Sequence, residues 1–263
     1  MEQIRVRGLV VRENPVGEYD KLLTVVTEEI GRILVSGKAV RSLKSKHMPA
    51  TQLFCYSDFV LRKSHGYYYI SDSSLVESFY GLRLDLDNLA LASYICDVAA
   101  EMAVEGVGDE ELLRLTLNTL YALANHTKLP RAQIKAAFEL RCAAIEGFLP
   151  NLDVCDVCGA ATETVRKVYL DVMNGRLLCG DCLRNVRHTD DLVDEGTAHI
   201  YLRLTPSVLE AMRFTVNAPG NRYLSFTLSE DELPTFANIC EKYLLNHLEH
   251  GFYTLDFYKS LLR

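Results

Sequence analysis

Two pairs of cysteines constrain the fold of this chain more than any other feature of its sequence. Two residues separate the cysteines within each pair, and twenty residues separate one pair from the other. Two intervening residues let both thiolates of a pair reach one ion, and two such pairs complete a tetrahedron with no open position. The spacing therefore predicts one structural zinc ion, bound by Cys155, Cys158, Cys179 and Cys182.

Four cysteines at this spacing also have other interpretations, and each has its own structural requirement. An iron–sulfur cluster also accepts four thiolates. Two local redox dithiols are a further alternative, but a thioredoxin-like site needs a single pair where a strand opens a helix. Coincidental burial is the last alternative. Catalytic zinc is disfavoured, because four cysteines leave no position for an activated water.

The residues between the two pairs have the pattern of a β-hairpin. Segments 165–170 and 176–179 alternate between apolar and polar residues, and Asn174-Gly175 is a typical hairpin turn. Such a hairpin would return the second pair to the first. Because residues 151–187 are too few to build a stable core alone, we expect the metal to close this module.

The composition is that of a globular protein. The chain has 263 residues, of which 49% are hydrophobic and 24% charged, and at ~100–200 residues per domain this length allows one to three domains. No segment approaches the ~18 apolar residues of a membrane helix, and the N-terminus lacks the pattern of a secretory signal. We expect a cytoplasmic protein whose remaining cysteines are buried: Cys55, Cys96, Cys142 and Cys240.

Residues 3–80 have the pattern of β-strands, and most of the rest has the pattern of helices. Five short apolar segments with Gly-containing turns predict strands near 4–11, 21–27, 32–36, 52–63 and 67–71, which together favour a small closed barrel. Three helices are expected between residues 85 and 147, joined closely enough to pack as antiparallel neighbours.

Further helices are expected near the C-terminus. Thr205 followed by Pro206 predicts the start of one helix. Ser229, with Glu232 three residues later, predicts a capping box that opens a long helix over 229–247. A short last helix is expected over 255–262.

A basic segment interrupts an acidic chain. The net charge is −7, yet no acidic residue lies between Ile30 and Ser57. Cations at this density attract phosphates, and the hydroxyls of Ser42 and Ser45 add hydrogen bonds. Nearby aromatic residues, Phe54, Tyr56, Tyr67, Tyr68 and Tyr69, are candidate stacking surfaces. The alternative is a solvated strand edge protected by lysine. The candidate cations for contact with nucleic-acid phosphates are Arg32, Lys38, Arg41, Lys44 and Lys46.

Several segments, in this order, resemble the RecO family over essentially the whole chain. They are the opening strand that ends in GLVVRENP, the segment GKAVR with KSK after it, the passage FELR and GFLP before the first cysteine pair, and NGRLLC at the second. The family usually has glycine where this chain has Ala39, which would stiffen the loop.

The resemblance implies an α+β multidomain protein. It implies an OB-fold barrel over residues 1–80 that binds DNA, a helical domain over 81–150 and 188–263, and a four-cysteine zinc module over 151–187 inserted in the helical domain. A bacterial, nucleoid-associated location follows from the same likeness.

The resemblance also implies a function without catalysis. RecO-like proteins bind single- and double-stranded DNA, anneal complementary strands and, with RecR, help to load RecA onto DNA coated by single-strand binding protein. Lys38 and Arg41 match the family's basic stretch and are the first candidates for DNA contact, and Arg32, Lys44 and Lys46 come next.

Two other classes of function remain open. An enzyme is disfavoured, because the chain has no phosphate-binding glycine loop, no H-E-x-x-H and no G-x-S-x-G. The close pair His247 and His250 is expected at a helix C-terminus rather than at a catalytic site. A zinc-containing scaffold that binds proteins but not DNA also fits the composition.

Overall fold

The computed structural model describes residues 3–64, 66–125, 128–190 and 199–262. Contacts divide the chain into two compact units. The first unit comprises Met1–Leu129 and Phe252–Arg263, and the second comprises Pro130–Gly251. The domain boundaries expected from the sequence group residues by type of secondary structure, whereas these units group them by contact, so the three-domain division stays a prediction.

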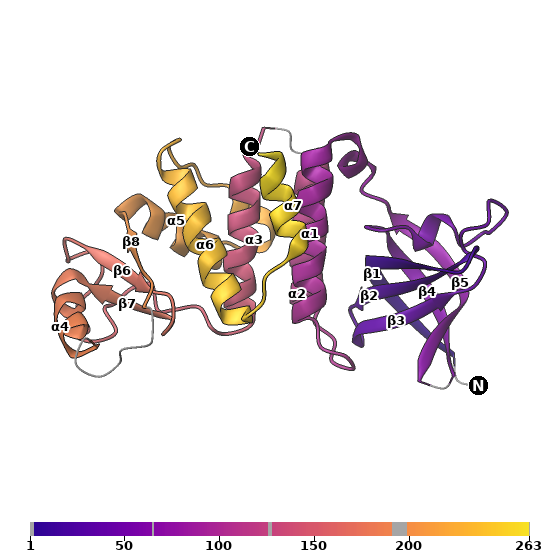
Figure 1. Cartoon of the computed structure of the whole chain (residues 1–263), viewed down its shortest axis with the longest axis horizontal. Coiled ribbons are helices and arrows are strands. Elements are labelled where there is room, and N and C mark those ends of the chain that lie inside the picture. Colours follow the sequence, from indigo (N-terminus) through magenta and orange to yellow (C-terminus); the bar gives the residue numbers. More distant parts are fainter. Residues whose placement is uncertain (1–2, 65, 126–127, 191–198, 263) are drawn as a thin grey trace. The chain divides into compact units, whose positions relative to one another are not determined.

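Five strands of the first unit close into a barrel (Figure 1). Around the barrel the order is β1-β2-β3-β5-β4; β3 and β5 pair in parallel, and antiparallel pairing of β1 with β4 completes the closure. The predicted closed barrel and the α+β class are confirmed. The strands are β1 (Gln3–Val16), β2 (Asp20–Thr27), β3 (Gly31–Gly37), β4 (Tyr56–Ser64) and β5 (Tyr67–Glu77).

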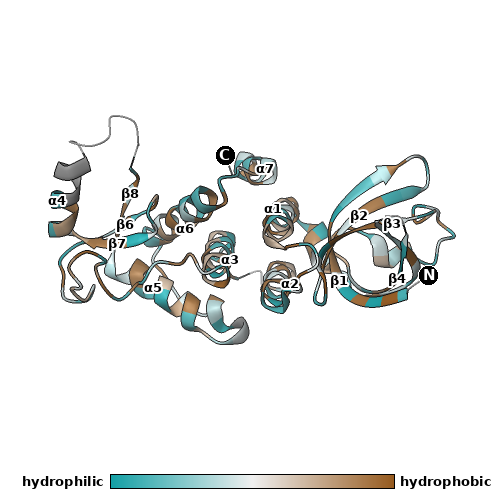
Figure 2. Ribbon diagram, turned by 90° about the horizontal axis from the view of Figure 1, so that it is seen from below, coloured by the Kyte–Doolittle hydropathy of each residue, from teal (hydrophilic) through white to brown (hydrophobic). Residues whose placement is uncertain are grey.

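The barrel encloses a core of alternating apolar residues. Val6 and Val10 on β1 and Leu23 and Val25 on β2 are buried together. Leu9, Val11 and Val26 alternate with them and are also buried, outside this cluster. Figure 2 shows the resulting mixture of hydrophobic and hydrophilic residues along these strands. Pro49–Thr51 forms a 3-10 helix (η1). Strand β4 begins later than predicted, because the chain turns after η1, with Phe54 at a φ of +66°.

Three helices belong to the barrel unit: α1 (Leu86–Met102), α2 (Glu110–Asn125) and α7 (Tyr253–Leu261). Asp85 caps α1 by accepting from the N–H of Asn88 at 2.9 Å. A 3-10 helix (η2, Tyr80–Leu84) leads into α1.

Helix α7 lies against α1 although it is formed by residues near the end of the chain. Phe252 and Tyr94 meet edge to face at 5.6 Å, and Thr254 donates to the Asp97 carboxylate at 2.8 Å. The other oxygen of Asp97 pairs with Arg12 of β1 at 2.5 Å. One carboxylate therefore joins the barrel, α1 and the returning helix.

The second unit combines helices with a three-stranded antiparallel sheet of order β7-β6-β8. The hairpin of β6 and β7 around Asn174-Gly175 is confirmed, and β8 and α4 were not predicted. Its elements are α3 (Arg131–Ile145), β6 (Val168–Asp171), β7 (Arg176–Cys179), α4 (Gly180–Asp190), β8 (Tyr201–Leu204), α5 (Pro206–Asn217), a 3-10 helix η3 (Gly220–Leu224) and α6 (Glu232–Leu248).

The sheet shares one core with the helices of its unit. Leu170 of β6 and Leu204 of β8 are buried with Leu140 of α3, Val208 of α5 and Phe236 of α6. The sheet strands of the predicted cysteine module therefore pack against apolar residues of α3, α5 and α6. The module need not build a core of its own.

The two last helices of this unit begin differently from the sequence expectation. Thr205 caps α5 as predicted, because its hydroxyl accepts from the N–H of Val208 at 3.2 Å. The predicted capping box of Ser229 and Glu232 is wrong. Glu232 instead accepts from the Thr205 hydroxyl at 2.8 Å, and α6 begins without a side-chain cap. Thr205 thus links the N-termini of both helices.

The longest described helices, α1 and α6, have 17 residues each. Within the described ranges, no helix combines the length and the apolar character that crossing a membrane requires.

Candidate metal centre and nucleic-acid interface

The four predicted cysteines meet in the second unit. Cys155 and Cys158 lie in the loop that precedes β6, Cys179 ends β7, and Cys182 lies in the first turn of α4. All four sulfurs lie within 4.8 Å of one another, and the Sγ atoms of Cys158 and Cys179 are 3.9 Å apart. A tetrahedral ion with metal–sulfur bonds of ~2.3 Å has sulfur–sulfur edges of about 3.8 Å. The cluster has the size to bind one metal ion.

Backbone N–H groups point at the sulfurs. The N–H of Cys179 donates to Cys155 Sγ at 3.2 Å, and that of Cys182 donates to Cys179 Sγ at 3.5 Å. Burial acts to raise the pKa of Cys155, but N–H donors at Cys158, Cys179 and Val157 outweigh it and lower that pKa to about 6. Burial and three neighbouring thiols raise the pKa of Cys182. Four sulfurs this close ionise together only around a cation.

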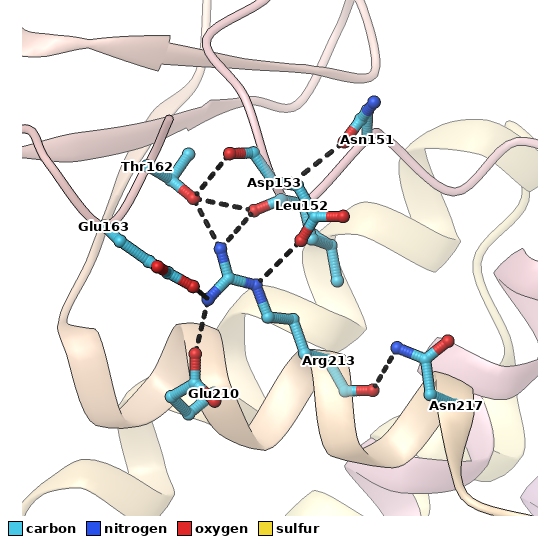
Figure 3. Close-up of polar contacts among 8 residues, drawn as sticks. All are labelled: Asn151, Leu152, Asp153, Thr162, Glu163, Glu210, Arg213 and Asn217. Atoms are coloured by element: carbon cyan, nitrogen blue, oxygen red, sulfur yellow. Dashed lines mark hydrogen bonds and ion pairs between the residues drawn. The ribbon is translucent and has the colours of Figure 1, made fainter. Parts of the chain in front are cut away.

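Arg213 of α5 fixes the loop that bears the first cysteine pair (Figure 3). Its guanidinium donates to the carbonyl of Leu152 at 3.1 Å and to the hydroxyl of Thr162 at 2.6 Å. It also pairs with Asp153 at 3.1 Å and with Glu163 at 3.4 Å. These contacts fix residues 152–153 before Cys155 and residues 162–163 after Cys158, so one side chain holds both ends of the loop that bears the first cysteine pair.

The other four cysteines are buried, as predicted. Burial raises the pKa of the Cys55, Cys96 and Cys240 thiols. A buried thiol with a raised pKa is a poor nucleophile, and none of these three belongs to a group of potential metal ligands among the described residues. The metal-binding chemistry of the described cysteines is therefore confined to the cluster.

The barrel unit carries the basic segment, residues 38–46, between β3 and η1. Its backbone is tied to the turn between β1 and β2. The Ala39 N–H donates to Asp20 Oδ1 at 2.7 Å, and the Arg41 N–H donates to the carbonyl of Tyr19 at 2.9 Å. Arg41 Nη1 reaches the carbonyl of Gly17 at 3.2 Å. The segment is therefore an ordered loop with its cations outward.

The candidate cations differ in how free they are. Lys38 and Lys44 are exposed and form no ion pair within the described residues. Lys46 pairs with Asp72 at 2.9 Å, with both side chains mostly exposed. Arg32 lies apart on β3, where its guanidinium donates to the carbonyl of Ala100 at 2.7 Å. Lys38, Arg41 and Lys44 therefore offer more charge to a ligand than Arg32 does.

The aromatic residues predicted as stacking surfaces differ in how much of each side chain is exposed. Phe54 is 1% exposed and offers no stacking surface. Tyr67 is 50% exposed, and it lines a surface pocket of about 520 Å³ together with Tyr68 and Arg32. Tyr19, which the sequence reading missed, is 51% exposed beside the basic segment.

Two family models cover nearly all of the chain. The model described as recombination protein O N terminal matches residues 1–79, and the model described as recombination protein O C terminal matches residues 83–256. The chain belongs to the RecO family. The resemblance seen in the sequence is confirmed. The RecO boundary, between residues 79 and 83, falls where the barrel passes into η2.

Named RecO proteins align with two thirds or more of the chain. The DNA repair protein RecO of Acetivibrio thermocellus is 30% identical over 263 residues, 100% of this chain and 99% of that protein. That of Caldanaerobacter subterraneus is 25% identical over 261 residues, 99% of each. That of Clostridium acetobutylicum is 28% identical over 182 residues, 69% of this chain and 72% of that protein.

One site residue of this RecO chain was out of reach of sequence reasoning. Arg213 reads as an ordinary helix cation, since nothing local marks its contacts with the cysteine loop. Arg213 and Thr162 are 51 positions apart in the sequence, and only the folded chain brings them together.

Proposed function

We propose that this RecO-family chain is a recombination and repair mediator that binds single- and double-stranded DNA on its barrel. In this role it anneals complementary strands and, with RecR, helps to load RecA onto DNA coated by single-strand binding protein. The observation that carries the proposal is the ordered basic segment, which presents Lys38, Arg41 and Lys44 from a closed barrel in a chain of this family.

Electrostatics support the location of the proposed DNA contact. The chain as a whole is acidic, so DNA is repelled from most of it and attracted to a local excess of cations. Ordering the segment through Asp20, Tyr19 and Gly17 lowers the entropy lost when phosphates bind. Tyr67 and Tyr19, each about half exposed, are the aromatic surfaces available for stacking of bases.

We further infer that the cysteine cluster binds one structural zinc ion. Four thiolates at tetrahedral spacing are the donor set of closed zinc sites. When bound, the ion neutralises thiolates and completes the fold of the loop before β6, and it leaves no position for a reacting water. The residues that would hold it are Cys155, Cys158, Cys179 and Cys182.

The test of the proposed function is a charge reversal of the basic segment. The variant Lys38→Glu/Arg41→Glu should bind labelled single strands more weakly. It should also lower the slope of log affinity against log salt by about 1.4, since each phosphate contact on a single strand contributes about 0.7. Fluorescence anisotropy across a salt series measures both quantities.

A matched control carries the same change in charge elsewhere. Arg222 and Lys242 are exposed in the second unit and form no ion pair within the described ranges, so Arg222→Glu/Lys242→Glu should keep the wild-type slope. If the Lys38/Arg41 variant binds DNA like wild type and still captures RecR and single-strand binding protein, the chain is a protein scaffold without DNA binding on this face.

A further inference from the structure

The sheet of the second unit has two different faces. Val168, Leu170 and Leu204 turn toward the helices and are buried. Tyr169 of β6 and Arg203 of β8 lie directly opposite each other in the ladder and so share the other face. Tyr169 is partly exposed and Arg203 is exposed. This face therefore offers an aromatic ring and a cation side by side.

A cleft of about 690 Å³ opens beside Arg203, between the start of β6 and the start of α4. Four cations line it, Arg166, Lys167, Arg184 and Arg203, against the single carboxylate of Asp181. Arg184 pairs with that carboxylate at 2.5 Å. Arg166, Lys167 and Arg203 are exposed and form no ion pair with any residue that the structure describes.

We propose that Arg166, Lys167 and Arg203 form a second binding site for the phosphate backbone of a nucleic-acid strand. The class of ligand rests on the proposed function, whereas the site itself lies on the other unit from the basic segment of the barrel. Three unpaired cations around one cleft repel each other in a chain of net charge −7, and a polyanion removes that repulsion. Tyr169 supplies a ring for an adjacent base.

A nucleic-acid strand fits this cleft better than an acidic protein segment does. Both are anionic, but a partly exposed aromatic ring, that of Tyr169, lies opposite Arg203, one of the cations that line the cleft, which suits a backbone with bases attached. With two separate backbone sites, one chain can hold two strands at once. Simultaneous binding raises the effective concentration of one strand near the other, which is what annealing requires.

The cations also lie near the cysteine cluster, because Cys179 lines the same cleft. A divalent ion with four thiolates keeps a net negative charge, so the cations could serve only to balance it. The two roles separate experimentally. Balancing predicts that loss of the cations loosens the metal and leaves DNA binding unchanged, whereas a backbone site predicts a change in salt dependence while the metal stays bound.

The experiment uses the full chain and the variant Arg166→Glu/Arg203→Glu, with Arg222→Glu/Lys242→Glu as the control of equal charge change. A labelled single-stranded oligothymidylate is titrated by anisotropy across a salt series, and annealing of complementary oligonucleotides is followed by fluorescence quenching. The cleft variant should lose about 1.4 from the salt slope, at about 0.7 per phosphate, and anneal more slowly. The control should match wild type.

Combination with Lys38→Glu/Arg41→Glu distinguishes this site from the barrel site. If the barrel variant keeps its slope while the cleft variant loses it, the barrel assignment fails and the cleft site stands. If the cleft variant keeps the wild-type slope and annealing rate in both backgrounds, the cleft site is overturned. Metal release by the cleft variant at an unchanged slope overturns it as well, in favour of charge balance.

A labelled oligoglutamate peptide tests the other anionic partner. Binding of this peptide that disappears in Arg166→Gln/Arg203→Gln, while the DNA slope of that variant equals wild type, assigns the cleft to an acidic protein segment and overturns the proposal. These uncharged substitutions also keep the result interpretable if charge reversal weakens the fold.

Discussion

Ala39 has a backbone conformation that suits glycine. Its φ is +52°, in the left-handed region, where a Cβ atom costs roughly 1–2 kcal/mol. The hydrogen bond from its N–H to Asp20 helps to hold it there. The basic segment therefore contains a strained residue at its first turn, just beside Lys38.

Replacing Ala39 with glycine should stabilise the barrel unit. Removal of the left-handed strain gains roughly 1–2 kcal/mol, and the extra freedom of glycine in the unfolded chain takes back roughly 0.4–1 kcal/mol. A net gain of about 1 kcal/mol should appear as a higher midpoint in urea unfolding.

The opposite substitution at the same position is the control. A β-branched side chain is strongly disfavoured at positive φ, so Ala39→Val should lower the midpoint. Equal midpoints for Ala39→Gly, Ala39→Val and wild type would mean that this turn does not keep its left-handed residue in solution.

The loop with the first cysteine pair depends on α5, an element some fifty positions later in the chain. Arg213 supplies the link through Leu152, Thr162 and Asp153. The Arg213 side chain is 13% exposed, so its contacts are only partly screened by water. The position of the first cysteine pair and the packing of α5 are therefore coupled within the second unit.

The variant Arg213→Gln should bind metal less tightly. Loss of a hydrogen-bonded charged group costs about 1.5–3 kcal/mol, and 1.4 kcal/mol corresponds to about a tenfold change in affinity. Release to a chromophoric chelator should be about tenfold faster or more, and wild type should contain one zinc ion per chain by elemental analysis.

Arg222→Gln, an exposed arginine in η3 of the same unit, is the control and should release metal at the wild-type rate. Wild-type chain that purifies with iron, or folds identically after complete removal of metal, would contradict the structural zinc site.

The success of sequence reasoning followed the strength of local patterns. The barrel strands alternate through residues such as Val6, Leu23 and Val25, so their number and order of appearance could be predicted. Strand β8 has only four residues, and its partner β6 lies about thirty positions earlier, so nothing local indicates it. The predicted capping box is absent because the Glu232 carboxylate accepts a hydrogen bond from the hydroxyl of Thr205, which is distant in the sequence, and not from the N-terminus of its own helix.

The candidate sites show the same division. The cysteine spacing alone predicted which four sulfurs meet, because two local knuckles and a hairpin suffice to bring them together. The run of cations predicted the basic segment but not the separation of Arg32, since that depends on the carbonyl of Ala100 in α1. Arg166 and Arg203 line the same cleft because β6 pairs with β8. The sequence did not predict β8, so it did not predict that these two cations lie together.

At the scale of the molecule, the barrel unit is built from two distant parts of the chain. Three large side chains from the end of the chain are buried in that unit: Phe252, which precedes α7, and Leu255 and Tyr258 within α7. The second unit, by contrast, is one continuous segment, Pro130–Gly251. Loss of the last helix should therefore damage the unit that begins the chain and spare the unit that immediately precedes the helix.

Deletion of residues 252–263 tests this division. Removal of three buried large side chains, at roughly 2–5 kcal/mol each, should lower the stability of the barrel unit by about 5 kcal/mol or more. Hydrogen exchange should show lost protection in β1–β5 and α1, with protection and metal content of the second unit retained.

Tyr253→Ser, at a residue that is 83% exposed, should behave like wild type and serves as the control. Equal loss of protection in both units after the deletion would show that they unfold as one body and that the contact-based division has no thermodynamic meaning.

The return of α7 to the barrel unit also bears on how the chain is made. During synthesis the barrel strands emerge first, but Tyr94 and Asp97 meet Phe252 and Thr254 only after every residue of the second unit has left the ribosome. The second unit, including its cysteine cluster, can fold in the meantime, because it is one contiguous segment. A nascent chain that stalls before Phe252 therefore leaves α1 partly uncovered and open to proteases. Completion of the barrel unit thus requires that translation has passed α7.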